Sequence, residues 1–385
     1  MKEISRVVTQ MPASGIRRFF DIVSQMDDVV SLGVGEPDFT TPWRIRESAI
    51  YSLERGRTSY TSNYGLLELR KAISEYLNKH WQVQYNPENQ ILITVGVSEG
   101  MDLAMRAIVN PGDEVIVPEP CYVSYKPCVE LAGGVAVVLE TNAEAGFRVT
   151  PEQVEAAITG KTKAILISYP SNPTGATADR ELLTKLVEVA RAHDLYIISD
   201  EIYDRLTYDG EHTCIPTIPG AYERTILLNG FSKAYAMTGW RIAYAAGAPD
   251  VIEAMMKIHQ YTMLCAPIIG QIAALEAIKN AYDDSQEMIE QYRMRRHVIV
   301  KGLNDAGLHC QTPGGAFYAF PSIKQTGLTS DEFCERLLFE EKVAVVPGGA
   351  FGAGGEGHIR CSYATSLENI EIAVQRMAKF VNTLK

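Results

Sequence analysis

The chain has 385 residues, of which 46% are hydrophobic and 22% are charged, a composition that is ordinary for a globular protein. Its formal net charge of -11 argues against nucleic acid as a partner, because a phosphate backbone attracts clustered Lys and Arg. No run of about 18 apolar residues occurs, so we expect no membrane span and no membrane partner. The seven cysteines show no C-x-x-C spacing, which predicts reduced thiols, no metal site and a cytoplasmic location.

The first ninety residues are expected to form helices joined by loops. A short helix is predicted within residues 14–23. Amphipathic helices are predicted over 42–55 and 68–77, where apolar residues recur at helical spacing. Residues 31–39 (SLGVGEPDF) and 58–65 (TSYTSNYG) are rich in glycine or hydroxyl groups and are typical of loops.

From residue 91 onwards, buried strands alternate with helices. The predicted strands are short, continuous apolar runs: 91–95, 115–118, 135–139, 164–168, 196–199, 226–229 and 242–246. Such strands, separated by helices such as 101–109 and 180–194, are typical of a mostly parallel sheet covered on both faces. The sequence therefore predicts an α/β fold with a large domain built on this sheet.

The pattern changes after a long predicted helical stretch at 251–280. Strands are expected over 314–323, 343–347 and 358–364, and helices over 331–341 and 367–381. This α+β mixture indicates a smaller domain. We predict a large domain at 46–285 and a small domain made of 1–45 and 286–385, with the N-terminal segment packed against the C-terminal part because the sheet begins only at 91.

One glycine-rich motif is misleading. Residues 352–357 (GAGGEG) match the G-x-G-x-x-G pattern of dinucleotide-binding folds. That pattern binds a dinucleotide only where a helix begins within it. Since the following residues 358–364 (HIRCSYA) are typical of a strand, we predict no nicotinamide site.

Polar residues follow successive strands of the predicted sheet. They are Ser98, Asn172, Asp200, Tyr203 and Lys233. Because ligands on parallel sheets bind at the carboxyl ends of the strands, these side chains are expected to meet. Taken singly, Asp200 is a plausible helix cap and Asn172 a plausible turn residue. The prediction of a site depends on the set.

Lys233 is the candidate nucleophile of this set. It lies in a loop of small, aromatic and hydroxyl residues, where desolvation lowers the pKa of the amine and lets it form a Schiff base with a carbonyl. Arg241, eight residues later, is a fixed cation suited to a phosphate.

Seven motifs give the sequence a family resemblance. They are 31–39 (SLGVGEPDF), 169–175 (YPSNPTG), 199–203 (SDEIY), 229–233 (NGFSK), 237–244 (MTGWRIAY), 313–318 (PGGAFY) and 358–364 (HIRCSYA). The chain resembles class I aminotransferases of fold type I, in the branch that holds bacterial and archaeal aspartate, aromatic and alanine aminotransferases. The motifs occur in family order over nearly the whole chain, so the resemblance is specific.

The resemblance implies pyridoxal 5'-phosphate (PLP) as cofactor, held covalently by Lys233. Asp200 would face the pyridine nitrogen and keep it protonated, and Tyr203 and Asn172 would donate to the phenolic oxygen. Tyr122 would stack on the ring. The phosphate would be bound by Gly96, Val97, Ser98, Ser232 and Arg241, and by Tyr60 of the neighbouring subunit.

The resemblance also assigns residues to the substrate. Arg360 would bind the α-carboxylate through a bidentate fork that lysine cannot copy, and Gly35 would contact the same group, with Asn172 and Tyr122 beside it. Two positions depart from the pattern. Gly230 stands where many relatives carry a phosphate-binding Ser, and Ser98 stands where some aspartate-specific relatives carry a Lys, which favours broader acceptance of side chains.

The function implied is an aminotransferase that moves the amino group of an aromatic, aspartate-type or alanine-type L-amino acid to a 2-oxo acid. The expected acceptor is 2-oxoglutarate, the kinetics ping-pong, and the assembly a homodimer with shared active sites. Alternatives on the same fold are a carbon–sulfur lyase and a cyclopropane-carboxylate synthase. A regulator with an aminotransferase-like sensing domain is a remote alternative, because the motifs begin at residue 31 and leave no room for an N-terminal DNA-binding module.

Overall fold

Seven strands form the central sheet, in the order β2–β8–β7–β6–β5–β3–β4. The computed structural model describes residues 2–11 and 26–384, so the helix predicted within 14–23 lies outside the described residues. The strands are β2 (Ile91–Thr94), β3 (Glu114–Glu119), β4 (Val135–Glu140), β5 (Thr162–Ile167), β6 (Tyr196–Asp200), β7 (Thr225–Gly230) and β8 (Ala243–Ala246). Neighbouring strands are parallel except β8, which is antiparallel to β2 and β7. The predicted α/β fold with a mostly parallel sheet is confirmed.

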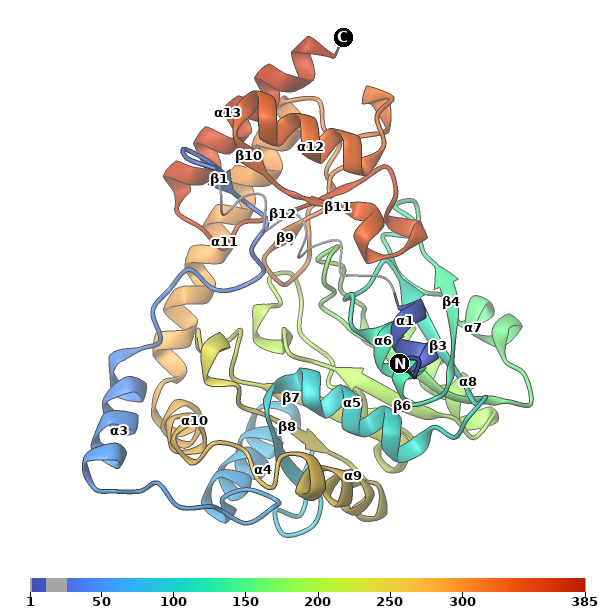
Figure 1. Cartoon of the computed structure of the whole chain (residues 1–385), viewed down its shortest axis with the longest axis vertical. Helices are drawn as coiled ribbons and strands as arrows, with labels where there is room; N and C mark the ends of the chain where they lie inside the picture. The colour runs from blue at the N-terminus through green and yellow to red at the C-terminus, as the bar shows by residue number, and fades with distance from the viewer. Residues whose placement is uncertain (1, 12–25, 385) are drawn as a thin grey trace.

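Some helices cover the two faces of this sheet, and others lie with the C-terminal strands at one end of the molecule (Figure 1). The helices are α1 (Arg6–Gln10), α3 (Trp43–Glu54), α4 (Leu67–Trp81), α5 (Gly96–Ile108), α6 (Tyr125–Leu131), α7 (Pro151–Ala157), α8 (Arg180–Ala192), α9 (Pro249–Thr262), α10 (Ile268–Asn280), α11 (Tyr282–Asp305), α12 (Ser330–Glu341) and α13 (Leu367–Thr383). Short 3₁₀ turns occur at Asp204–Leu206, Ile215–Thr217, Tyr222–Arg224, Thr238–Trp240, Lys324–Thr326, Gly348–Phe351 and Ala353–Gly355. Among the described helices, none combines the length and the apolar character needed to cross a membrane.

Successive residues of each central strand enter different cores. Val115 and Val117 pack in the cluster that includes α5, whereas Ile116 packs in the cluster that includes α8. Leu166 and Ile165 divide in the same way. Since the side chains of a strand alternate between its faces and both faces are covered by helices, the strands contain continuous apolar runs.

The helical stretch predicted at 251–280 is two helices, so that prediction is wrong in its continuity. α9 ends at Thr262 and α10 begins at Ile268, with Pro267 as its N-cap. Proline lacks a backbone N–H and disfavours helical geometry in the residue before it, so the chain breaks there.

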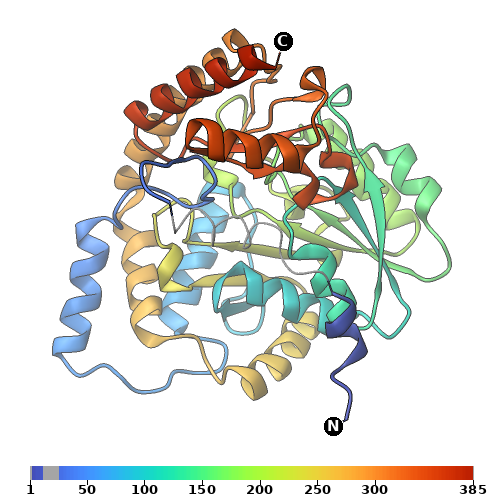
Figure 2. The same cartoon turned by 45° about the horizontal axis from the view of Figure 1, so that its top comes forward.

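The C-terminal region contains a second, antiparallel sheet of three short strands. These are β11 (Val346–Pro347), β12 (Ile359–Ser362) and β9 (Tyr318–Ala319), in that order. The strand expected over 314–323 is therefore only two residues long. Figures 1 and 2 show helices α12 and α13 at this end of the molecule, away from α4, α9 and α10.

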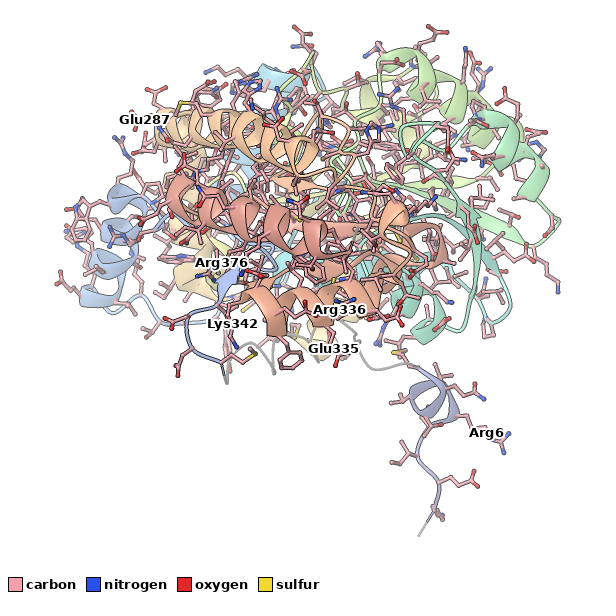
Figure 3. All side chains as sticks on the ribbon, turned by 90° about the horizontal axis from the view of Figure 1, so that it is seen from above. Arg6, Glu287, Glu335, Arg336, Lys342 and Arg376 are labelled. Atoms are coloured by element: carbon pink, nitrogen blue, oxygen red, sulfur yellow. The ribbon has the colours of Figure 1, made fainter. Side chains whose placement is uncertain are left out.

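Part of the N-terminal segment joins this region. β1 (Val30–Ser31) pairs in parallel with β10 (Val343–Ala344). Arg376 on α13 donates to the backbone oxygens of Asp28 and Lys342 (Figure 3). The first helix, α1, contacts α6 instead, and Figure 3 shows its Arg6 standing apart from the body. The division into two domains stays a prediction. Helix α11 runs across the proposed boundary at 285.

Candidate active site

A cavity of about 420 Å³ opens at the carboxyl edge of the central sheet. Its lining comes from strand ends, from the start of α5, from residues 34–36 and from the C-terminal region. Eleven predicted site residues line it: Gly35, Val97, Ser98, Tyr122, Asn172, Asp200, Tyr203, Ser232, Lys233, Arg241 and Arg360. The carboxyl ends of the strands thus meet in one place, as the parallel arrangement requires.

Lys233 follows β7 and reaches into this cavity. Its Nζ donates to the carbonyl oxygen of Gly35 at 2.7 Å. The aromatic rings of Tyr203 and Phe317 lie 5.9 and 5.8 Å from the amine. Burial lowers the pKa of Lys233 to about 8, and the positive charge of Arg360 adds to this effect. At that pKa about a tenth of the amine is neutral at pH 7, against fewer than about one in a thousand for an ordinary lysine.

Asp200 ends β6 and is a buried part of the cavity lining. It accepts hydrogen bonds from the Tyr125 hydroxyl at 2.8 Å and from the Ile202 backbone at 3.1 Å. Burial raises the pKa of Asp200 to about 6, although both hydrogen bonds oppose the rise. The sequence did not indicate Tyr125. Its spacing of three residues from Tyr122 was the available signal, since one helical turn can bring both toward the same site.

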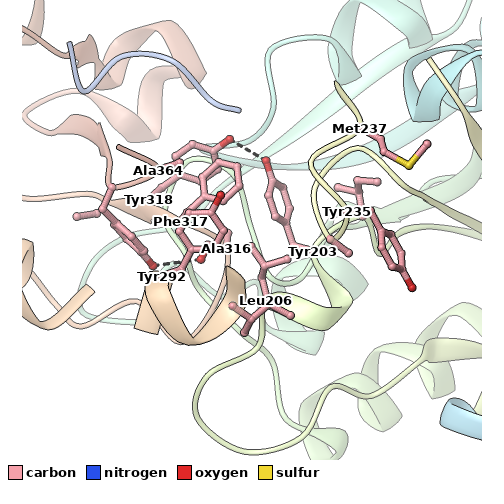
Figure 4. Packing of buried hydrophobic residues seen from close by; sticks show 14 of the residues in the cluster. Tyr203, Leu206, Tyr235, Met237, Tyr292, Ala316, Phe317, Tyr318 and Ala364 are labelled. Carbon is pink, nitrogen blue, oxygen red and sulfur yellow. Dashed lines mark hydrogen bonds between the residues drawn. The ribbon is translucent and has the colours of Figure 1, made fainter. Parts of the chain in front are cut away.

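A tyrosine pair connects the sheet edge with the C-terminal region. The hydroxyls of Tyr203 and Tyr318 are 2.7 Å apart (Figure 4). Tyr318 also donates to the Gly35 oxygen at 3.4 Å. Burial raises the pKa of Tyr203 well above its usual range, so it is a neutral donor at physiological pH. Tyr318 belongs to a motif used for the resemblance, but its contact with Tyr203 was not predicted.

Arg360 projects from β12 and is 4% exposed. Its Nη1 donates to Asn172 Oδ1 at 3.0 Å and its Nη2 to the Gly33 oxygen at 2.6 Å. The rings of Tyr318 and Phe351 flank the guanidinium at 4.6 and 4.9 Å. Its buried Nε has no hydrogen-bond partner, and no carboxylate of the described residues forms an ion pair with it. A buried guanidinium without a counterion favours an anionic ligand.

The start of α5 and Arg241 form the other cationic end of the cavity. The helix begins at Gly96, whose φ is +77°. A Cβ there would overlap the Arg241 guanidinium, so glycine permits this close approach. Arg241 donates to the Thr238 oxygen at 3.0 Å. Together with Ser98 and the free amides of the first helical turn, this end suits a phosphate.

Gly230 has a structural explanation. It is fully enclosed at the end of β7, where a Cβ would lie 2.6 Å from the Cβ of Ala243 on β8. A serine side chain therefore has no room at this position. Ser232 and Thr238, which also line the cavity, carry the nearby hydroxyls.

Two predicted residues are not part of the cavity lining. Tyr60 is 83% exposed and lies outside the lining of its own chain. Gly96 is also outside the lining, but it lies close to the Arg241 guanidinium, which is part of it.

The comparisons with known proteins agree with this geometry. Residues 27–377 match the family "Aminotransferase class I and II", so the chain belongs to that family and is an aminotransferase. The family uses PLP. The chain is 54% identical to the putative aminotransferase YugH of Bacillus subtilis, over 98% of each chain. It is 44% identical to an aspartate aminotransferase of Pyrococcus abyssi, over 97% of this chain and 96% of the relative. The crystal structure of an aromatic aminotransferase from Pyrococcus horikoshii superposes with a TM-score of 0.91 at 42% identity, covering 95% of this chain and 99% of that one.

Proposed function

We propose that this aminotransferase moves the amino group of an L-amino acid of aromatic, aspartate or alanine type to a 2-oxo acid, with 2-oxoglutarate as the expected acceptor. One observation carries the proposal: the Lys233 amine, with its pKa lowered to about 8, shares a cavity with the buried Arg360, which lacks a counterion. The names of the relatives, one an aspartate and one an aromatic aminotransferase, support the same range of substrates.

The groups that line the cavity are those that PLP requires. A nucleophilic amine, a buried carboxylate and a cationic helix start lie around one space, and the missing Cβ of Gly96 leaves Arg241 close to the helix amides. Lys233 would hold the cofactor covalently, Asp200 would face its pyridine nitrogen, and Tyr122 would lie against its ring. Tyr203 and Asn172 would face its phenolic oxygen. The phosphate would be held by Gly96, Val97, Ser98, Ser232 and Arg241. When bound, PLP withdraws electrons from the substrate α-carbon.

Residues of the chain would bind the substrate and remove its proton. Arg360 would bind the α-carboxylate, and the carbonyl and amide groups around it, from Gly33 and Asn172, fix its orientation. With the carboxylate held there, the Cα–H bond rather than the Cα–carboxylate bond is presented to Lys233. Lys233 Nζ would then remove the Cα proton as general base. This arrangement favours amino transfer over decarboxylation.

The cavity offers the substrate side chain few charges. Its three cations, Lys233, Arg241 and Arg360, each have a role in this scheme. The other described lining residues are the apolar or aromatic Val34, Met101, Ile202, Tyr125 and Tyr318 and the polar Glu36, Ser124 and Thr238, and none of them is a cation. A distal carboxylate would therefore need a cation from a second subunit, whereas an aromatic or small side chain would not.

A homodimer is part of the proposal. Tyr60 is exposed in its own chain, so it would reach a phosphate only in the cavity of a second copy. Large exposed apolar side chains occur nearby in the sequence and on the α9–α10 turn: Trp43, Ile50, Tyr51, Leu53, Tyr261, Met263 and Leu264. The Asn63 side chain donates to the Leu264 oxygen, so the two segments are adjacent. Such exposed apolar groups favour a protein partner, and light scattering of the purified protein tests the dimer.

A donor panel tests the function. Purified PLP-loaded protein is mixed with aromatic amino acids, aspartate or alanine at fixed 2-oxoglutarate, and glutamate formation is measured. We expect glutamate from at least one donor, with parallel lines in double-reciprocal plots for a ping-pong reaction. Pyruvate and ammonia from cystathionine without any oxo acid, and no glutamate from any donor, would favour the lyase alternative instead.

A further inference from the structure

The glycine-rich segment 352–357 covers a buried carboxylate. Glu119, the last residue of β3, is 8% exposed, and the backbone N–H of Ala353 donates to its carboxylate. A Cβ at Gly352 would overlap the same carboxylate, and Gly352 has a φ of +115°. Glycine at 352 is thus required both for the turn and for the close approach of Glu119.

A backbone hydrogen bond strengthens this junction. The N–H of Cys121 donates to the Phe351 oxygen at 3.0 Å. On the other side, the Glu119 carbonyl accepts from the backbone and hydroxyl of Thr141, at 2.7 and 2.8 Å. Residues 119–121 are therefore fixed to the central sheet, and residues 351–353 are fixed to them.

Each side of the junction leads directly to a wall of the active-site cavity. Tyr122 follows Cys121 and lines the cavity, and Tyr125, three residues later, donates to Asp200. On the opposite side, Phe351 is 2% exposed and its ring lies 4.9 Å from the Arg360 guanidinium. The Glu119 carboxylate and the Cys121–Phe351 hydrogen bond thus join the segment of Tyr122 to the segment that supports Arg360.

We propose that Glu119 is a positioning residue for amino transfer: it fixes Phe351, and through it Arg360, relative to the wall formed by Tyr122 and Asp200. The inference rests on the proposed function, because it assumes that Arg360 binds the substrate carboxylate. Glu119 acts through these neighbours and does not line the cavity.

Two substitutions of Glu119 should affect its contact with the Ala353 N–H differently. The Ala353 N–H is a neutral donor, so an amide oxygen at 119 would accept it nearly as well as a carboxylate does. Glu119→Gln should keep this contact. Glu119→Ala should lose it and weaken the junction, which then depends on the Cys121–Phe351 hydrogen bond alone. Glu140→Gln is the matched control, because Glu140 pairs with Glu119 across β3 and β4, is exposed, and loses the same charge.

The experiment uses PLP-loaded enzyme and 3-phenylpropanoate, which has a carboxylate and an aromatic side chain but no amino group. For Glu119→Ala, its dissociation constant by calorimetry and the KM of the amino donor should rise about tenfold, because small misplacements of a binding group are costly. The kcat should stay within about twofold. Glu119→Gln and Glu140→Gln should both resemble the unaltered enzyme. Unchanged binding in Glu119→Ala, or equal losses in Glu119→Ala and Glu119→Gln, would overturn the proposal.

A second variant tests the contact from the other side, should Glu119→Ala fold poorly. Gly352→Ala places a methyl group against the Glu119 carboxylate and should weaken 3-phenylpropanoate binding by a similar factor. In the double variant the losses should be less than additive, because both act on one contact; additive losses would contradict the inference. Arg360→Lys tests separately whether Arg360 binds the carboxylate and whether Glu119 positions Arg360. If it leaves 3-phenylpropanoate binding unchanged, the proposed role of Arg360 is wrong; if it weakens binding while Glu119→Ala and Gly352→Ala do not, only the coupling is wrong.

Discussion

The two walls of the active-site cavity are built in different ways. Asp200 is the last residue of β6 and Lys233 follows β7, and both strands are buried and hydrogen-bonded to neighbours on both sides. Arg360 and Tyr318 come from β12 and β9, strands of four and two residues. Their positions depend on side-chain contacts, such as the Arg360 hydrogen bond to Asn172. In the proposed scheme Asp200 and Lys233 would contact PLP, and we call them the cofactor wall; we call Arg360 and Tyr318 the substrate wall. The cofactor wall is held in place by hydrogen-bonded strands, and the substrate wall by side-chain contacts that single substitutions can weaken.

The largest expected effect is on the cofactor wall. In the proposed scheme Lys233 both holds PLP and acts as the base, so Lys233→Ala should lower turnover by about 10⁴-fold or more. The absorbance of bound PLP and the rate of glutamate formation measure the two losses. Lys257→Ala, at an exposed lysine paired with Glu253, is the control and should leave both unchanged. Appreciable turnover by Lys233→Ala would contradict the assignment.

A graded effect is expected on the substrate wall. Arg360→Lys keeps the charge but loses the planar fork, so it cannot hold the carboxylate, Asn172 and Gly33 together. We expect kcat/KM for the amino donor to fall about 10–100-fold, mainly through KM, since charged hydrogen bonds contribute about 1.5–3 kcal/mol. Steady-state kinetics measure the change. An unaltered KM would show that the substrate carboxylate binds elsewhere.

Tyr125→Phe tests a contact inside the cofactor wall. The hydroxyl lowers the pKa of Asp200, so its removal should raise that pKa and move the acid limb of the pH–rate profile to higher pH. Loss of one such hydrogen bond corresponds to about 3–10-fold in rate near pH 6. Ser168→Ala is the matched control, because it removes the other partner of the Tyr125 hydroxyl, at 3.0 Å, and keeps the bond to Asp200. An acid limb that moves equally in both variants would rule out this role.

The smallest effect concerns the pKa of Lys233, which the positive charge of Arg360 lowers. PLP uptake by protein stripped of PLP requires neutral Lys233, so its rate should rise with pH and level off above about 8. Arg360→Met removes a cation that lowers this pKa, so the midpoint should move to higher pH. A midpoint near 10.5 in the unaltered protein would mean that Lys233 is as well solvated as in an unfolded chain.

The same pKa shift affects stability. Since burial favours the neutral amine, the unfolded chain binds one more proton than the folded chain between about pH 8 and 10.5. The contribution of Lys233 to stability should therefore rise with pH across that window. Urea denaturation at several pH values, compared with Lys233→Met, measures it.

The sequence indicated residues of both walls, but it did not indicate the contacts that hold the substrate wall in place, for a physical reason. Asp200 and Lys233 follow apolar strands, and the ends of such strands meet wherever the sheet is mainly parallel. The Tyr203–Tyr318 hydrogen bond joins residues more than a hundred positions apart. The contact of Phe351 with Arg360 joins a 3₁₀ turn to the short strand β12. Such contacts arise from tertiary packing, which no local pattern encodes.

Element boundaries show the same contrast. The central strands were predicted within about two residues, because continuous apolar runs have sharp ends. The break between α9 and α10 was missed, although Pro267 marks it, since the apolar periodicity continues on both sides. The strand expected at 314–323 is reduced to β9, because Gly314 and Gly315 form tight contacts with residues 170–177 after β5 and with residues 206–208 after β6.

The long helix α11 has a consequence for any attempt to take the protein apart. It runs from the neighbourhood of α10 to that of α13 (Figure 1), and its 24 residues correspond to a rod of about 36 Å. Severing the chain at 285 would cut this rod in its first turn and lay bare Met288, Ile289 and Tyr292, all now enclosed. Fragments made at that point should be insoluble alone and should regain activity only when expressed together.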